Sequence, residues 1–171
     1  MLKRFVLAAL AGTLLSCGGG GGGSTSSTAV TVPPTPAVSI TAAGTGTLVL
    51  HPSLASAFAY TLEAPIRIRE TAGGTADWNF ARFSVYKGGR EVERGEIGSD
   101  TIRTAGFSRI AANSDKTYNV YFRFNSDDFD DLRVTLGFAD LKDARQFTVD
   151  VADDWTDLVV SPTPAAAPPR R

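Results

Sequence analysis

Apolar and polar residues alternate along most of residues 38–161, as they do in half-buried β-strands. Tyr118, Val120, Phe122 and Phe124 show the period most clearly, because they occupy every second position of one run. Successive side chains of a strand point to opposite faces, so this run has one aromatic face directed at a core. Strands are predicted in the same way at residues 38–41, 47–51, 58–62, 66–69, 83–92 (a hairpin turning at Gly88-Gly89), 101–107, 132–138, 147–151 and 155–160.

The spacing of these segments predicts the fold class. Seven to nine short strands recur at intervals near ten residues, and no window carries a sustained apolar repeat of 3.6 residues. Short polar stretches at residues 125–131 and 140–143 separate the last three clear runs, so we expect these to be successive antiparallel strands. The sequence therefore predicts one all-β domain over residues 38–161, a sandwich of two antiparallel sheets.

A family resemblance rests on the run Phe83-Ser84-Val85-Tyr86-Lys87-Gly88-Gly89-Arg90-Glu91-Val92. It resembles the central strand and turn of FxLYD-type domains, with Val85 in place of the leucine and Lys87 in place of the aspartate. Residues 66–151 are also similar to immunoglobulin-like modules of bacterial surface proteins. The resemblance implies an Ig-like sandwich in the bacterial envelope. It brings no catalytic residues.

The N-terminus has the pattern of an export signal that ends at the sole cysteine. Lys3 and Arg4 precede an apolar stretch, residues 5–15, that is too short to span a bilayer. Small Ser16 then precedes Cys17. This arrangement resembles the lipobox of bacterial lipoproteins, which implies cleavage of a signal peptide, a diacylglycerol on the thiol and a third, palmitate-type acyl chain on the freed amine. An ordinary secretory signal with an incidental cysteine is the alternative.

The predicted signal peptide of residues 1–16 and the lipidated Cys17 have consequences for location and chemistry. Two or more acyl chains hold a protein stably on a membrane, and Gly18, where retained lipoproteins often carry aspartate, favours the outer membrane. Cleavage changes the formal charge from −1 to −3, a poor match to nucleic acid. With its only thiol lipidated, the chain has none for disulfides, metal binding or nucleophilic catalysis.

Low-complexity segments flank the predicted domain. Residues 17–37 contain six consecutive glycines, followed by serine, threonine and proline. Such a segment has little to bury, so we expect a disordered spacer with a reach of about 25 Å for twenty residues. The Pro- and Ala-rich tail of residues 162–171 is expected to be disordered as well, because its prolines interrupt both helix and sheet.

The domain offers few groups for catalysis or metal binding. His51 is the only histidine, so neither a serine–histidine mechanism nor a usual zinc site is expected. The acidic turn of residues 125–131, with Asp153, Asp154 and Asp157, could provide oxygen ligands for calcium. A solvated turn that hydrogen-bonds its own backbone is the alternative that the residues favour. We therefore expect no cofactor, no metal and no catalytic residues.

Two kinds of partner remain open at this stage. Trp78, Tyr86, Tyr121 and Trp155 could stack on sugars, and Tyr121 is the best candidate because it falls on the polar side of its strand. A coplanar exposed pair of such rings would favour glycans, whereas a bare hydrophobic edge or a charged face would favour protein. The sequence thus predicts a membrane-anchored, non-enzymatic interaction module, with glycan binding as the alternative.

Overall fold

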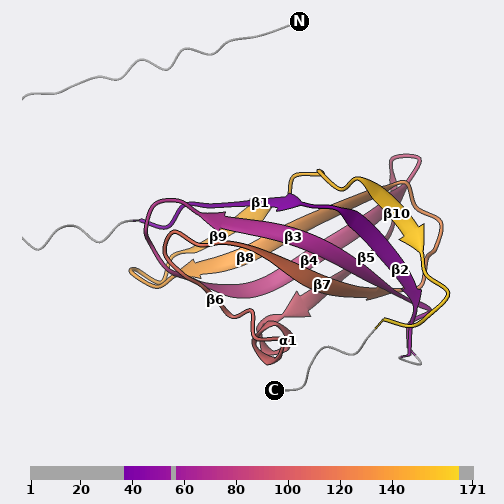
Figure 1. Cartoon of the computed structure of the whole chain (residues 1–171), viewed down its shortest axis with the longest axis horizontal. Coiled ribbons are helices and arrows are strands. Elements are labelled where there is room, and N and C mark those ends of the chain that lie inside the picture. The colour runs from indigo at the N-terminus through magenta and orange to yellow at the C-terminus, as the bar shows by residue number, and fades with distance from the viewer. Residues whose placement is uncertain (1–36, 55–56, 166–171) are drawn as a thin grey trace, which may run out of the picture. The chain divides into compact units, whose positions relative to one another are not determined.

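The computed structural model describes residues 37–54 and 57–165, which form ten β-strands and one short helix (Figure 1). In chain order they are β1 (Ile40–Gly44), β2 (Thr47–Pro52), β3 (Tyr60–Glu70), β4 (Ala76–Lys87), β5 (Arg90–Gly98), α1 (Ser99–Thr104), β6 (Arg109–Ile110), β7 (Asp115–Phe124), β8 (Asp131–Asp140), β9 (Gln146–Asp150) and β10 (Asp157–Val160). The strands belong to two five-stranded sheets, and nearly all pairs are antiparallel.

The two sheets have central strands β3 and β4. β1 and β2 follow one another along one side of β3, β7 pairs with its other side, and β10 runs parallel to β2. β5 and the short β6 lie on one side of β4, with β8 and then β9 on the other. This order is that of an Ig-like sandwich. The predicted fold class is confirmed, with ten strands instead of seven to nine.

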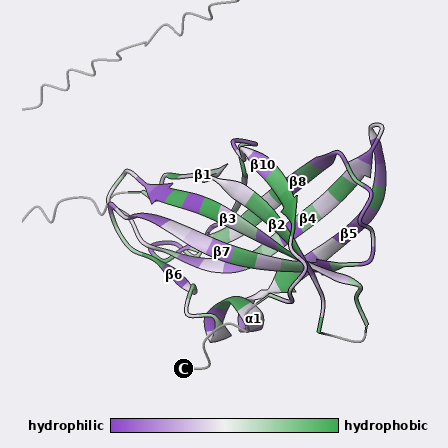
Figure 2. Ribbon diagram, turned by 45° about the vertical axis from the view of Figure 1, so that its right-hand side comes forward, coloured by the Kyte–Doolittle hydropathy of each residue, from purple (hydrophilic) through white to green (hydrophobic). Residues whose placement is uncertain are grey.

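The alternating residues fill one core between the sheets. Figure 2 shows hydrophobic and hydrophilic positions alternating along β3. In this strand the buried Ile66 and Ile68 are separated by the exposed Arg67. The ring centroids of Phe83 on β4 and Phe122 on β7 are 4.9 Å apart, so the sheets meet through aromatic contacts. Burying such side chains is the main source of stability in a domain without disulfides.

Pro65 lies in the middle of β3, where the sequence predicted a break between two strands, 58–62 and 66–69. The amide and carbonyl of one strand residue point to the same side, and the Pro65 carbonyl accepts a hydrogen bond from the Thr45 amide at 3.0 Å. The missing N–H of Pro65 therefore faces the point where the neighbouring strand changes from β2 to β1. No ladder bond is needed there, so the strand continues through the proline.

The predicted strand at residues 101–107 is wrong, because this segment forms the helix α1 and the turn after it. The β-branched Thr101 and Ile102 suggested a strand. Asp100 in the first turn and Gly106 just after the helix, with φ of 79°, are helix start and stop signals that outweigh this preference. Ile102 is the buried residue of the helix and fixes α1 against the sandwich.

One side of the sandwich is closed by a strand that changes sheet. β9 pairs with β8, then Ala152 bridges to Ala43 of β1 in parallel, and β10 continues along β2. Trp155 lies in the connection between β9 and β10. Its indole Nε1–H donates to the Pro65 carbonyl at 3.1 Å, and its ring covers Gly44. The first and last strands are thereby held together on this side.

We expect Gly44→Val to destabilise the domain by about 1–3 kcal/mol, as overpacked core sites do. A side chain at Gly44 would overlap the Trp155 ring, which would have to leave its place over the strand. Urea unfolding of the two proteins measures the difference. Gly98→Ala is the control, because a Cβ at Gly98 meets no atom within 4 Å. Equal midpoints for Gly44→Val and wild type would contradict the role given to Trp155.

Two buried carboxylates bind the backbone at the start of the domain. Glu70 is 2% exposed and accepts backbone hydrogen bonds from Ser39, Ala72, Gly73 and Asn113 at 2.8–3.1 Å. Burial disfavours its charged form, yet the four amides stabilise that form and hold the pKa of Glu70 below its ordinary value. Asp140, equally buried, accepts from the amides of Val38 and Lys142.

Candidate binding groove

The side of the sandwich opposite β10 is open. It lies between β5, which pairs only with β4, and β7, which pairs only with β3 among the described strands. A groove of about 790 Å³ runs between these two edges, bounded by α1 and by the chain after β2. Its volume lies within the usual range of ligand sites.

The groove exists because β5 directs few apolar side chains into the space between the sheets. Toward the facing sheet, β5 turns Glu93, Gly95 and Ile97, whereas β7 turns buried apolar residues. The Phe83 ring packs directly on Gly95, where a Cβ would lie 2.6 Å from it, so β5 adds no side chain of its own at this position. Apolar side chains therefore form most of the lining, including Trp78, Phe83, Ile97, Ile102, Phe107 and Val120.

Backbone groups of β7 form one wall of the groove. The Asn125 amide, at the end of β7, points toward β5, where it donates to the Glu93 carboxylate at 2.8 Å. Backbone direction alternates along a strand, so the amides and carbonyls of Asn119, Tyr121 and Arg123 point the same way. These three residues line the groove.

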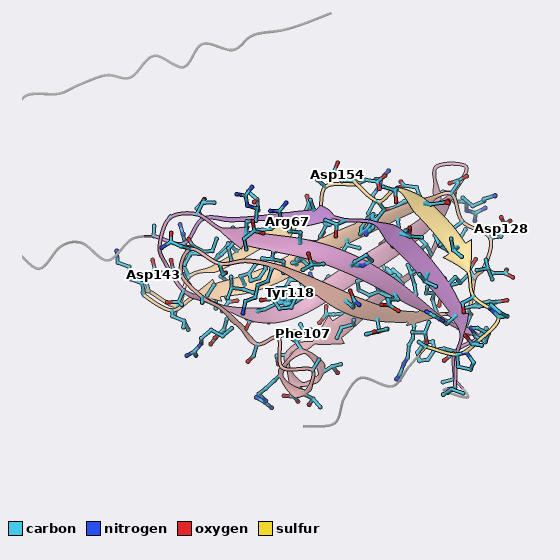
Figure 3. All side chains as sticks on the ribbon, in the orientation of Figure 1. Arg67, Phe107, Tyr118, Asp128, Asp143 and Asp154 are labelled. Atoms are coloured by element: carbon cyan, nitrogen blue, oxygen red, sulfur yellow. The ribbon has the colours of Figure 1, made fainter. Side chains whose placement is uncertain are left out.

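Strand β5 also directs backbone groups to the open side. The Tyr86 carbonyl of β4 points away from β5, to the Asp130 amide, so by alternation residues 85, 83 and 81 of β4 bond to residues 93, 95 and 97 of β5. The amides and carbonyls of Arg94 and Glu96 therefore point to the open side. At one end Glu93 closes the gap, because its carboxylate binds the amides of both Asn125 and Ser126. At the other end, Phe107, which follows α1, packs edge-on against Tyr118 of β7, with ring centroids 5.1 Å apart (Figure 3).

The charges along the groove are unequally engaged. Glu93 is bound by two backbone amides, and Glu96 forms a 2.6 Å pair with Arg82. Arg94 is 80% exposed and lies 3.8 Å from Glu91, a loose pair. Arg123 is exposed. The two arginines of the groove are therefore more available to bind a charged ligand than its two glutamates are.

Apolar residues also surround the mouth of the groove. Leu54 is 80% exposed and Phe58 37% exposed, and both lie in the connection between β2 and β3. Exposed apolar side chains gathered beside an unfilled groove are typical of an interaction site. Ala165, near the end of the described chain, reaches the lining as well.

His51 lies on β2 and connects the C-terminal segment to the sheet. Its Nδ1 is 2.9 Å from the Thr163 carbonyl, and its Nε2 is 3.5 Å from the Glu63 carboxylate. These contacts tie strand β2 to the chain beyond β10. They give His51 a structural role.

The acidic turn of residues 125–131, considered for calcium, makes other contacts with its carboxylates. Asp127 accepts from the Tyr60 hydroxyl at 2.8 Å, which raises the pKa of that tyrosine, and Asp128 pairs with Lys87 at 2.6 Å. A smaller hollow is lined by Asp130, Asp131, Asp153 and Asp157. Asp128 and Asp154 are labelled in Figure 3 on their separate loops. Within residues 37–54 and 57–165, no three His, Cys, Asp or Glu side chains gather closely enough to hold a metal ion.

The aromatic residues considered for sugar stacking are used inside the domain. Trp78 is 2% exposed and donates to the Phe80 carbonyl, and Trp155 lies against Gly44. The guanidinium of Arg133 covers the Tyr86 ring, 4.3 Å from its centroid. Tyr121 is half-buried, and burial together with the nearby Glu63 raises its pKa. These rings do not form the exposed coplanar pair that stacking on a sugar requires.

The predicted lipidation site, Cys17, lies outside the described residues, as do the signal peptide and most of the spacer. In the part of the chain that the structure describes, no helix is long and apolar enough to cross a membrane.

The groove was not predicted from the sequence. Charged residues of one hairpin arm suggest a charged outer face: Arg90, Glu91, Glu93, Arg94 and Glu96. Gly95 among them is the only sign that β5 lacks a side chain toward the core. Comparison with known proteins adds no relative, because no family model and no curated protein matches the chain.

Proposed function

We propose that the protein is a lipid-anchored lipoprotein of the bacterial envelope, on the outer membrane, whose sandwich binds a partner without catalysis. The groove between β5 and β7 is the observation that carries this proposal. It joins an apolar lining of ligand-site size to two strand edges whose hydrogen-bonding groups face it. The lipobox-like N-terminus and the spacer support the location.

Photo-crosslinking in intact cells tests this function. A benzophenone amino acid at Thr101, which is exposed and lines the groove, is expected to capture a partner. The same amino acid at Asp143, in the exposed turn between β8 and β9 (Figure 3), is the control and should capture little. Equal products from both positions, or none from Thr101, would contradict a binding role for the groove.

A further inference from the structure

The two strand edges restrict what the groove can bind. Asn119, Tyr121 and Arg123 direct backbone amides and carbonyls toward it from β7, as Arg94 and Glu96 do from β5. A ligand that covers such groups without bonding to them leaves them unsatisfied, at about 1–3 kcal/mol for each. An acyl chain or another apolar molecule would fit the lining but would leave these groups unpaired.

An extended polypeptide satisfies both features at once. Its backbone can pair with a strand edge, and every second side chain then points to the same face. Along β7 that face holds the apolar lining around Phe83, Ile102 and Phe107. We propose, on the basis of the function proposed above, that the groove binds an extended peptide segment of a partner protein as an added strand on β7, with alternate apolar residues and an acidic residue.

The acidic residue follows from the charges. Glu93 and Glu96 are engaged by backbone amides and by Arg82, which leaves Arg94 and Arg123 to meet an incoming carboxylate. Arginine binds carboxylates with two parallel hydrogen bonds, so it adds orientation as well as attraction. A basic segment would meet like charge instead.

The length of the bound peptide segment can be inferred from the part of β7 that lines the groove. The lining residues of β7 run from Asn119 to Arg123, beyond which Glu93 closes the gap. At about 3.3 Å for each residue, five residues of an extended partner match this wall. Longer partners would continue past α1.

The test uses the purified full-length protein and an array of acetylated octapeptides. The peptides alternate valine or isoleucine with threonine and carry one glutamate or one lysine. Thr101→Trp fills the groove, and Thr104→Trp places the same side chain on α1 outside the lining. The best glutamate peptide is expected to bind wild type and Thr104→Trp equally, and Thr101→Trp at least tenfold more weakly.

Charge and backbone pairing are tested with the same peptide. Arg123→Glu should weaken its binding about tenfold and favour the lysine peptide, whereas Lys116→Glu, on the same strand but away from the lining, should change neither. N-methylation of alternate peptide amides should abolish binding in one register and spare it in the other, because only one set faces β7.

Four results would overturn the proposal. One is that no peptide of the array distinguishes Thr101→Trp from wild type. Another is that laurate binds wild type more tightly than Thr101→Trp, whereas no peptide does. The third is that the protein dimerises through this face and binds no peptide. If a partner is crosslinked at Thr101 and any of these results is also obtained, the proposed function is supported. Only the proposal that the groove binds an extended peptide is then contradicted. Binding that N-methylation does not affect in either register would also exclude strand addition.

Discussion

Glu70→Gln is expected to lower the free energy of unfolding by about 3 kcal/mol at neutral pH. Each carboxylate oxygen of Glu70 accepts two backbone hydrogen bonds, Oε1 from Ser39 and Ala72 and Oε2 from Gly73 and Asn113. Glutamine has one oxygen, so two of the four amides would face an NH₂ group. Buried donors without an acceptor cost about 1–3 kcal/mol each. Urea unfolding at pH 7 measures the effect.

The same variant tests the pH dependence. The pKa of Glu70 is lowered in the folded protein, so its contribution to stability is full at neutral pH and is lost as the pH falls through that lowered pKa. Below it, protonated Glu70 resembles glutamine, and the difference between wild type and Glu70→Gln is expected to shrink. A difference that stays constant down to the acid transition would show that the charge is not what the four amides bind.

Asp115→Asn is the matched control for charge and pKa. Asp115 accepts two hydrogen bonds from Arg67, and this guanidinium lowers its pKa as well. Both side chains are exposed, however, and exposed ion pairs contribute little to stability. We expect Asp115→Asn to be much less destabilising than Glu70→Gln. Comparable losses would contradict the importance given to burial.

The strands with an unbroken two-residue period could be predicted from the sequence. Residues 118–124 and 132–138 lie in β7 and β8, and the predicted run 147–151 lies in β9 except for its last residue. β4 was predicted only in its second half, because the register shifts between Trp78 and Phe80. Before the shift the buried residues are Ala76 and Trp78, and after it they are Ala81, Phe83 and Val85. A bulge of this kind resets the alternation, so no single period describes the strand.

The candidate site could not be predicted in the same way. The groove forms because β5 places few apolar side chains between the sheets. A periodic pattern in the sequence indicates the side chains that fill a core, but it does not indicate a space that is left empty. Gly95 and the inward Glu93 read as part of a charged face, and only the pairing of β5 with β4 shows that they point to the core. The facing edge comes from β7, about 25 residues later, so the groove is a product of topology.

Cys17→Ala is expected to abolish fatty acylation of the protein completely. In the lipobox interpretation the thiol of Cys17 is the atom that receives the diacylglycerol, and alanine has no such group. Without this first lipid the lipoprotein-type cleavage does not follow, so the precursor should keep residues 1–16. Metabolic labelling with an alkyne fatty acid, followed by mass measurement of the purified protein, would show a labelled wild type and an unlabelled, longer variant.

Ser16→Ala is the matched control, because alanine is as small as serine beside the cleavage point and should leave labelling intact. The sandwich should unfold at the same urea concentration in wild type and Cys17→Ala, since residues 17–37 are rich in glycine, serine, threonine and proline and have little to bury. Equal labelling of wild type and Cys17→Ala would end the lipoprotein interpretation. The proposed location on a membrane would then lose its support, because two or more acyl chains are what would hold the domain stably there.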